Sequence, residues 1–255
     1  MGATVRLLVA PELRAFLPPR SRGDGEGDGG VDVPLDPGTP LAHLVPAAGV
    51  PLTEVGGLRV VDDDAAVTPA HRPSPGAVVE VAAVRRPQRG VSTGFVLDVH
   101  LGALARRMRL LGLDVAYAND AGDAELVARA LGETRVLLTQ DHALLRRRAL
   151  APVPAADGGA SLARAAHVRG SAVADQLDDV LGRFAPPLAP YTRCVACGGE
   201  LVPASADEVA HLLEPGTLRT YRVFVRCAAC GRPYWHGAHG QRLDALVRQA
   251  LHRHA

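Results

Sequence analysis

Four cysteines near the C-terminal end of the sequence are spaced as metal ligands. Cys194 and Cys197 form one C-x-x-C pair, Cys227 and Cys230 form another, and these are all the cysteines in the 255 residues. A glycine follows each pair and permits the tight turn that frees backbone N–H groups toward sulfur. Four thiolates are the ligand set of a tetrahedral Zn²⁺ site with no open position for water. We therefore expect a zinc ribbon whose Zn²⁺ is structural.

Two other uses of paired cysteines fit this sequence less well. Disulfides would need an oxidising compartment, which the N-terminal residues do not indicate, and a redox C-x-x-C motif would not be duplicated. The 29 residues between the two pairs exceed the common spacing in zinc ribbons. They leave room for a hairpin or for a helical insertion such as 205–213.

Three aspartates in the middle of the sequence form a second candidate metal site: Asp98, Asp123 and Asp141. Carboxylates that lie close together raise one another's pKa, so a divalent cation is needed to hold them together in the ionised form. Oxygen ligands suit Mg²⁺ or Mn²⁺, which can activate a water for attack on a phosphodiester. The competing explanation is that each aspartate only caps a helix. Asp98 separates the two, because an aspartate at the end of a strand is expected to have no cap role.

The segments that carry these aspartates predict a parallel sheet. Strand-like and helical patterns alternate there, with strands at 95–97, 114–118 and 135–139 and helices at 100–112, 119–132 and 142–150. This alternation implies parallel strands, whose carboxyl ends gather ligand-binding residues. Asp98 and Asp141 follow two of the strands, and Asp123 comes from the helix after the third. Three carboxylates are therefore expected at one edge of the sheet.

Local signals predict how two of these helices begin and end. Gly112 is expected to end the first helix. Asp120 is expected to cap the second, with Asp123 and Glu125 in its first turn.

The first 88 residues predict a separate β-grasp domain. Its elements follow the order strand, strand, helix, strand, strand, at 4–9, 31–35, 39–48, 58–61 and 77–84. A run of glycines and charged residues at 21–30 is expected to be a flexible loop. Breaks in composition at 85–94 and 184–190 divide the rest of the sequence.

Composition describes a globular protein with material for two or three small domains, since 47% of the residues are apolar and 22% are charged. No segment reaches membrane-spanning length and the N-terminus lacks a secretory signal pattern, so the cytoplasm is the expected compartment. All 28 basic residues are arginine, yet the net charge is only +1. Bulk charge therefore gives no argument for a nucleic-acid partner, which must come from sites.

The phrases FVLDVHLGALARRMRLLG, DAELVARA and VLLTQDHALL occur in this order at close spacing. Together they resemble the Mut-seven-C (Mut7-C) family, a branch of the PIN-like ribonucleases. The resemblance covers about residues 92–240. It implies a PIN-like three-layer α/β/α domain, metal-dependent cleavage of RNA, and acidic positions at Asp98, Asp123 and Asp141. Asp120 and Glu125 are weaker candidates for a further ligand or a supporting role.

Several other positions are candidates for contact with the substrate. Gln140 stands where many members have arginine, which puts one phosphate contact in doubt. The candidate RNA contacts are arginines of the first helix and an aromatic residue after the second cysteine pair: Arg106, Arg107, Arg109 and Trp235. For the arginines a solvated helix face is the competing explanation. Tyr234 and Trp235 could equally complete a small core, and His239 is a further candidate.

The N-terminal segment, with VPLTEVGGLRVVDDDAAV and PGAVVEVAAV, resembles the ubiquitin-like domain fused ahead of Mut7-C domains, itself similar to small sulfur carriers. Such carriers act through a free C-terminal Gly-Gly, whereas here the last strand continues into RRPQRGV. Carrier chemistry is therefore disfavoured, and a docking or scaffold role with a protein partner is the better interpretation.

These observations predict an α/β protein of three parts: a ubiquitin-like β-grasp domain at 1–88, a PIN-like nuclease core at 92–190, and a zinc ribbon with a C-terminal helix at 191–255. We expect a ribonuclease that uses Mg²⁺ or Mn²⁺ for catalysis and Zn²⁺ for structure, with RNA as its partner and no membrane. The alternative is a non-catalytic RNA-binding or adaptor protein in which the aspartates only cap helices.

Overall fold

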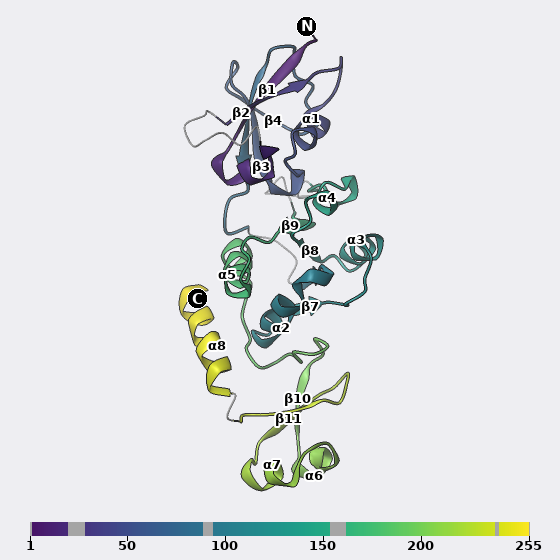
Figure 1. Ribbon diagram of the computed structural model, residues 1–255, viewed down its shortest axis with the longest axis vertical. Coiled ribbons are helices and arrows are strands. Elements are labelled where there is room, and N and C mark those ends of the chain that lie inside the picture. Colours follow the sequence, from purple (N-terminus) through teal and green to yellow (C-terminus); the bar gives the residue numbers. More distant parts are fainter. Residues whose placement is uncertain (1, 20–28, 89–93, 154–161, 238–239, 255) are drawn as a thin grey trace. The chain divides into compact units, whose positions relative to one another are not determined.

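The computed structural model describes residues 2–19, 29–88, 94–153, 162–237 and 240–254 (Figure 1). The chain divides into an N-terminal unit, which combines 1–90 with 139–167, and a second unit, which combines 91–138 with 168–255. The loop predicted at 21–30 lies almost entirely outside the described residues. Among the helices that the structure describes, none is long and apolar enough to cross a membrane.

A five-stranded sheet forms the body of the N-terminal unit. Its elements are β1 (Thr4–Val9), β2 (Gly30–Pro34), α1 (Leu41–Ala47), β3 (Val55–Val60), β4 (Ala65–Val67) and β5 (Val78–Ala83). The strand order is β2-β1-β5-β3-β4, with β1 and β5 parallel and the other pairs antiparallel. This is the predicted β-grasp arrangement. The short strand β4 was not predicted from the sequence.

The core of this unit follows from strand alternation and one helix face. Val5, Leu7 and Val9 of β1 point to the same side of the sheet and are at most 2% exposed. Leu41 and Leu44 of α1 are buried as well, since residues three apart on a helix share a face.

Residues 139–167 belong to the N-terminal unit and contain α4 (His142–Leu145), the 3-10 helix η5 (Arg148–Leu150) and β9 (Ala165–His167). The ring of Phe16, at the end of the 3-10 helix η1 (Pro11–Phe16), lies 4.7 Å from the ring of His142 and 5.1 Å from that of His167. The backbone N–H of His167 also donates to Glu54 Oε1 at 2.9 Å. Glu54 ends the 3-10 helix η3 (Leu52–Glu54) and is 1% exposed.

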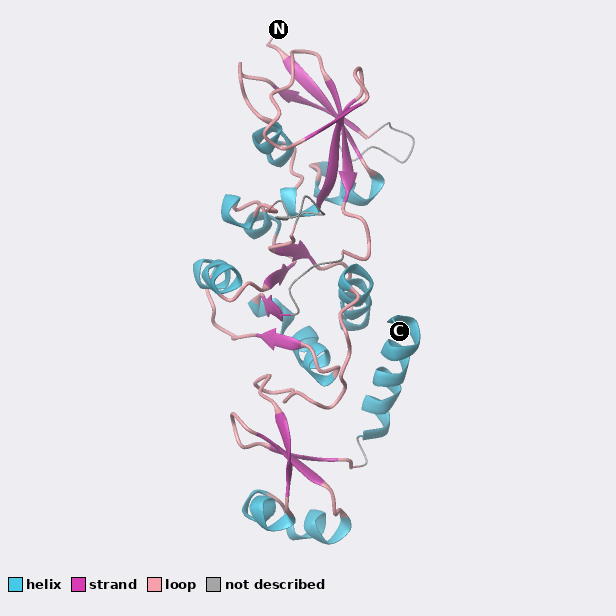
Figure 2. Ribbon diagram, turned by 180° about the vertical axis from the view of Figure 1, so that it is seen from behind, coloured by secondary structure: helices cyan, strands magenta, loops and turns pink. Residues whose placement is uncertain are grey.

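The second unit contains a parallel sheet in which β6 (Gly94–Leu97) pairs with β7 (Asp114–Ala116) on one side and β8 (Val136–Thr139) on the other. Every residue of β6 and β8 is buried, as expected for strands covered on both faces. Helices α3 (Asp123–Gly132) and α5 (Val173–Phe184) lie on opposite sides of this sheet (Figures 1 and 2). The predicted three-layer α/β/α arrangement is confirmed.

Helix α2 (Gly102–Leu110) is connected to β6 by the 3-10 helix η4 (Val99–Leu101). The apolar stripe predicted from its sequence is buried, with Leu104 and Met108 both at 0% exposure. The helix ends before Gly112, whose φ of +83° is the left-handed conformation that glycine adopts readily. The prediction for this helix end is confirmed.

The rest of the second unit is a small antiparallel sheet of β10 (Leu201–Ala204), β11 (Phe224–Cys227) and β12 (Pro233–Trp235) in that order. Between β10 and β11 the chain forms α6 (Ala206–Val209), the 3-10 helix η6 (Ala210–Leu212) and α7 (Pro215–Thr220). The long gap between the cysteine pairs therefore holds strands and helices together. The C-terminal helix is α8 (Gly240–His254).

Candidate functional site

The four cysteines gather into one cluster. Their Sγ atoms all lie within 4.8 Å of one another, with 3.8 Å between Cys194 and Cys230 and 3.4 Å between Cys197 and Cys227. A tetrahedral Zn²⁺ site with Zn–S distances of about 2.3 Å requires sulfur–sulfur distances of about 3.8 Å. The four side chains can therefore hold a metal ion, and their soft donor atoms and spacing fit Zn²⁺.

Two equivalent turns build the cluster. The N–H of Gly198 donates to Cys194 O at 2.8 Å, and the N–H of Gly231 donates to Cys227 O at 2.9 Å. Both glycines have a positive φ, +86° and +72°, which other residues adopt at a cost. The sequence C-x-x-C-G thus encodes the same turn twice.

Backbone donors also point at the sulfur atoms. The N–H of Gly199 lies 3.5 Å from Cys197 Sγ, and the N–H of Cys230 lies 3.4 Å from Cys227 Sγ. Gly199 has no room for a side chain, because a Cβ there would lie 2.8 Å from Cys227 Sγ. The backbone of Gly199 therefore packs directly against the sulfur atoms of the cluster.

The thiols of the cluster differ in acidity. Burial raises the pKa of Cys194, but hydrogen bonds from the Tyr234 hydroxyl, 3.0 Å away, and from backbone N–H groups outweigh it and lower the pKa to about 6. Burial and the neighbouring thiols raise the pKa of Cys197 to about 12. Four thiolates cannot coexist here without a compensating cation, which is what a bound metal supplies.

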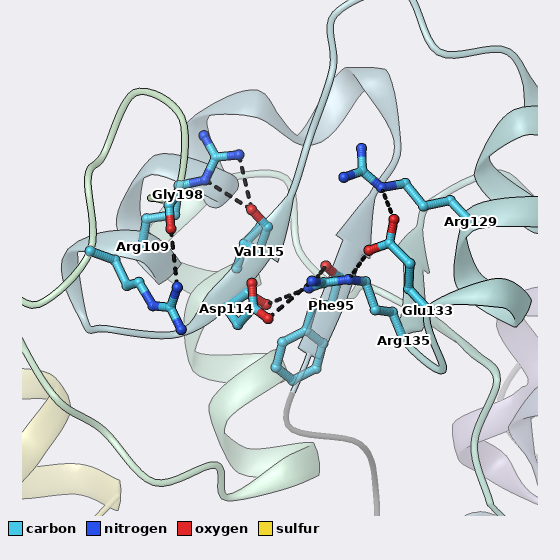
Figure 3. Close-up of polar contacts among 9 residues, drawn as sticks. Phe95, Arg109, Asp114, Val115, Arg129, Glu133, Arg135 and Gly198 are labelled. Carbon is cyan, nitrogen blue, oxygen red and sulfur yellow. Dashed lines mark hydrogen bonds and ion pairs between the residues drawn. The ribbon is translucent and has the colours of Figure 1, made fainter. Parts of the chain in front are cut away.

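A buried arginine joins the first cysteine turn to the parallel-sheet domain. Arg109 of α2 donates to Val115 O through Nε at 3.1 Å (Figure 3). A terminal nitrogen of the same guanidinium donates to Ala196 O at 2.7 Å. Its side chain is 2% exposed, and burial lowers its pKa, opposed by the Cys197 and Cys194 thiols. This placement does not support the RNA contact expected for Arg109.

The other expected RNA contacts lie at the surface. Arg106 is exposed and Arg107 is half-buried. Trp235 is 39% exposed, and its ring centroid lies 6.4 Å from that of Tyr221. His239 lies outside the described residues.

Asp98 directly follows β6 and is 7% exposed. Its backbone N–H donates to Leu138 O at 3.0 Å, so the ends of β6 and β8 are held together. Its Oδ1 accepts from the N–H of His100 at 3.5 Å, which makes Asp98 the N-cap of η4. The expectation that Asp98 has no cap role was wrong, because the chain turns into a 3-10 helix immediately after the strand.

Asp123 and Glu125 lie in the first turn of α3 and are exposed. The N-cap of α3 is Gly122, not Asp120 as predicted, because the helix begins later than its acidic sequence indicates. Asp120 is an exposed residue ahead of the helix.

Asp141 is the N-cap of α4. Its Oδ1 accepts from the N–H groups of Ala143 at 2.6 Å and Leu144 at 3.3 Å, and its own N–H donates to Thr139 Oγ1 at 2.9 Å. These contacts fix the direction of an exposed carboxylate. Asp98 and Asp123 belong to the second unit and Asp141 to the N-terminal unit, so their joint binding of a cation stays a prediction.

Some contacts around the predicted residues were not anticipated. The hydroxyl of Tyr117 donates to Val99 O at 2.8 Å, and a Cβ on Gly102 would lie 2.4 Å from that hydroxyl. Gly102 thus allows a close approach next to the Asp98 turn. The glycine that follows Leu101 is a sequence signal for such a close approach, but nothing in the sequence pointed to Tyr117 as the partner.

A second network stabilises the amino ends of β6 and β7. Arg135 forms ion pairs with Asp114 at 3.0 Å and with Glu133 at 2.5 Å (Figure 3). Burial lowers the pKa of Arg135, but its hydrogen bonds to both carboxylates raise it overall. The network lies at the opposite end of the strands from Asp98 and has a structural role.

Comparison with protein families gave two matches. Residues 93–247 match the family model described as the Mut7-C RNAse domain, and residues 2–89 match the model described as Mut7-C ubiquitin. Neither the comparison with curated proteins nor that with solved structures gave a match. The first family match covers more than half of the chain and includes all three aspartates and all four cysteines.

Proposed function

The chain belongs to the Mut7-C RNAse domain family, and from that premise we propose that it hydrolyses RNA phosphodiester bonds with a divalent cation held by Asp98, Asp123 and Asp141. The family assignment confirms the resemblance drawn from the sequence, and it supports ribonuclease activity in general. Dependence on a divalent cation, with the three aspartates as its ligands, goes beyond the family assignment and is proposed here.

The observation that carries the proposal is the pairing of β6 with β8. Both strands are parallel and end together, because Asp98 donates its N–H to Leu138 O. Asp141 follows Leu138 by only three residues. Catalytic groups of parallel α/β sheets occur at this edge, beyond the carboxyl ends of the strands.

The chemistry of the side chains fits a hard cation. Carboxylate oxygens are the ligands that Mg²⁺ and Mn²⁺ prefer. Such an ion, when bound, supplies an activated water and neutralises charge on the phosphodiester. Asp98 and Asp141 are each oriented by hydrogen bonds to backbone N–H groups, so they are held in place before any ligand arrives. Asp120 and Glu125 remain candidates for a supporting role.

The cysteine cluster has a different role in the proposal. We assign it a structural Zn²⁺, because four thiolates fill a tetrahedral coordination shell. Arg106, Arg107 and Trp235 stay as predicted RNA contacts, and the ubiquitin-like domain as a docking module for a protein partner. Thiolates kept available for metal favour a reducing compartment, so we retain the cytoplasm as the expected location.

Substitution by asparagine tests the proposal cleanly. Asparagine caps helices about as well as aspartate, so Asp98→Asn and Asp141→Asn remove charge while preserving the cap. We expect each to reduce Mg²⁺- or Mn²⁺-dependent cleavage of single-stranded RNA by about 100-fold or more. Asp62→Asn, an exposed aspartate of the β-grasp domain, is the matched control. Full cleavage by both variants would overturn the assignment.

The caps also favour a second candidate function. Because Asp98 and Asp141 both accept hydrogen bonds from backbone N–H groups, they could serve only as helix caps in a non-catalytic RNA-binding or adaptor protein. That function predicts RNA binding without metal-dependent cleavage in the wild-type protein. A cleavage assay with a labelled RNA, run beside a binding assay, distinguishes the two.

A further inference from the structure

The N-terminal unit contains a groove between the β-grasp fold and the segment that follows Asp141. Its volume is about 1190 Å³. One wall comes from α1, η3 and β3 and includes Pro46, Leu52 and Leu58, whereas the other comes from the end of α4 and from η5. Figure 1 shows α1 and α4 on the same side of this unit.

Arginines line the groove, and none of its lining residues is acidic. Arg146, Arg147 and Arg148 contribute from one wall and Arg72 from the other. All four are exposed. Within the part of the chain that the structure describes, Arg146 and Arg148 form no ion pair. The Nε of Arg72 donates to the backbone carbonyl of Gly38 at 2.9 Å. Among the described residues, the groove therefore presents the positive charges of Arg146 and Arg148 without a carboxylate partner.

The two walls are fixed to each other. The Phe16, His142 and His167 rings pack together, with His142 and His167 centroids 5.1 Å apart. Buried Glu54, which lies in η3 two residues after the lining residue Leu52, accepts the backbone N–H of His167. The ubiquitin-like domain thus holds the arginine-bearing segment in place, and the groove is formed before a ligand binds.

We propose that this groove binds single-stranded RNA and leads it toward Asp141. Its positive charge complements a phosphate backbone, and its volume exceeds that of typical small-molecule pockets, about 300–1,000 Å³. Its apolar surface provides contacts for riboses and bases without base-specific hydrogen bonds, so binding has little sequence preference. Arg146 follows Asp141 by only five residues. The inference rests on the proposed ribonuclease function, and it gives the ubiquitin-like domain a direct part in substrate binding.

The test measures binding separately from cleavage. Asp98→Asn serves as the full-length host protein, which is not expected to cut the RNA, and binding of a fluorescein-labelled 12-nucleotide oligo(U) is followed by anisotropy at several salt concentrations. In this host, Arg146→Ala and Arg148→Ala are each expected to weaken binding by about five- to tenfold. Each is also expected to lower the slope of log Kd against log salt by about 0.7, the value for one lost phosphate contact on a single strand. Arg85→Ala is the matched control, because Arg85 is an exposed arginine of the same unit that does not line the groove.

A second variant blocks the groove without changing its charge. Ala47 is exposed on α1 and lines the groove, so Ala47→Trp fills it and is expected to weaken RNA binding while the melting temperature stays within a few degrees of the wild type. The inference is overturned if the arginine variants bind RNA as Arg85→Ala does, or if a 12-residue poly-glutamate peptide occupies the groove and the RNA does not. Unchanged binding beside normal wild-type cleavage would remove this inference alone. Arginine-dependent binding without any wild-type cleavage would remove the ribonuclease proposal alone.

Discussion

The guanidinium of Arg109 donates a hydrogen bond of 2.7 Å to the carbonyl oxygen of Ala196, which lies inside the first C-x-x-C turn. The same side chain donates to the carbonyl oxygen of Val115, the middle residue of β7. One buried guanidinium therefore connects helix α2, the parallel sheet and the cysteine cluster. It also lies close to the Cys194 and Cys197 thiols, whose negative charge favours the charged form of Arg109.

Replacing this arginine should destabilise the protein. Arg109→Ala leaves the carbonyls of Val115 and Ala196 without their donors, and we expect a loss of about 2–4 kcal/mol in the free energy of unfolding. Arg109→Lys should restore little of this stability, because an ammonium group cannot reproduce the forked geometry with which arginine reaches two carbonyls. Urea denaturation measures both. Arg106→Ala, on the exposed face of the same helix, should stay within about 0.5 kcal/mol of wild type, and an equal effect at both positions would contradict the role of Arg109.

Metal analysis should find one Zn²⁺ per chain, and its retention should depend on Tyr234. The Tyr234 hydroxyl helps to hold the pKa of Cys194 at about 6, so Tyr234→Phe should raise that pKa. Protons compete with metal for thiolate, and a thiol with a higher pKa is deprotonated only at higher pH. The pH at which half of the Zn²⁺ is released to a chromogenic chelator should therefore move upward in this variant. Tyr221→Phe is the control, and superimposable release curves for the two variants would exclude this role for Tyr234.

Much of the fold was predictable because local patterns and the final packing agree. The apolar stripe of α2, the end of that helix at Gly112 and the alternation in β1 all depend on residues close together in the sequence. The strand β4 was missed because its three residues, AAV, include two alanines, which favour strands weakly and form no recognisable alternation. The sequence also gave no sign that 139–167 groups with the N-terminal unit, since Phe16 and His142 meet only after folding.

The candidate sites show the same contrast between local sequence signals and contacts that form only on folding. The cysteine ligands were predictable, because each C-x-x-C-G turn is local and only the meeting of two pairs is not. Arg109 was predicted to contact RNA at the surface of its helix, whereas it is buried against a carbonyl of a residue far along the chain. The cap role of Asp98 depends on a 3-10 turn that sequence periodicity does not reveal, because three residues make a single turn and no pattern repeats.

Substitution of two glycines by alanine should change the free energy of unfolding in opposite directions. Gly112 has a φ of +83°, and a Cβ there would lie 1.9 Å from the carbonyl oxygen of Ala189. Gly112→Ala should therefore cost about 3 kcal/mol or more from backbone strain and steric overlap. Gly132 lies in α3 with no atom within 4 Å of its Cβ position, so Gly132→Ala should stabilise by about 0.5–1 kcal/mol. Thermal unfolding compares the pair, and similar shifts in Tm would contradict the geometry at Gly112.

Loss of the Phe16 ring should loosen the segment that carries Asp141. Phe16 is 7% exposed and contacts the rings of His142 and His167, so Phe16→Ala removes packing that holds α4 and β9 to the β-grasp fold. Hydrogen–deuterium exchange should show faster exchange in residues 142–150 and 165–167, with little change in α5 and α8 of the second unit. Uniform acceleration across the chain would indicate general destabilisation instead.

The two roles of Asp141, as helix cap and as proposed metal ligand, can be separated by comparing two substitutions. Its Oδ1 accepts from Ala143 N–H and Leu144 N–H, and an asparagine side-chain oxygen can accept the same bonds. Asp141→Asn should therefore change the free energy of unfolding by less than about 0.5 kcal/mol, whereas Asp141→Ala should cost about 1 kcal/mol. If the carboxylate charge is needed for a cation, both variants should lose cleavage to the same extent, despite their different stabilities. If the residue only caps α4, activity should follow stability, and Asp141→Asn should cleave RNA like the wild type. Parallel urea denaturation and Mn²⁺-dependent cleavage assays on the two variants therefore decide which role the carboxylate has.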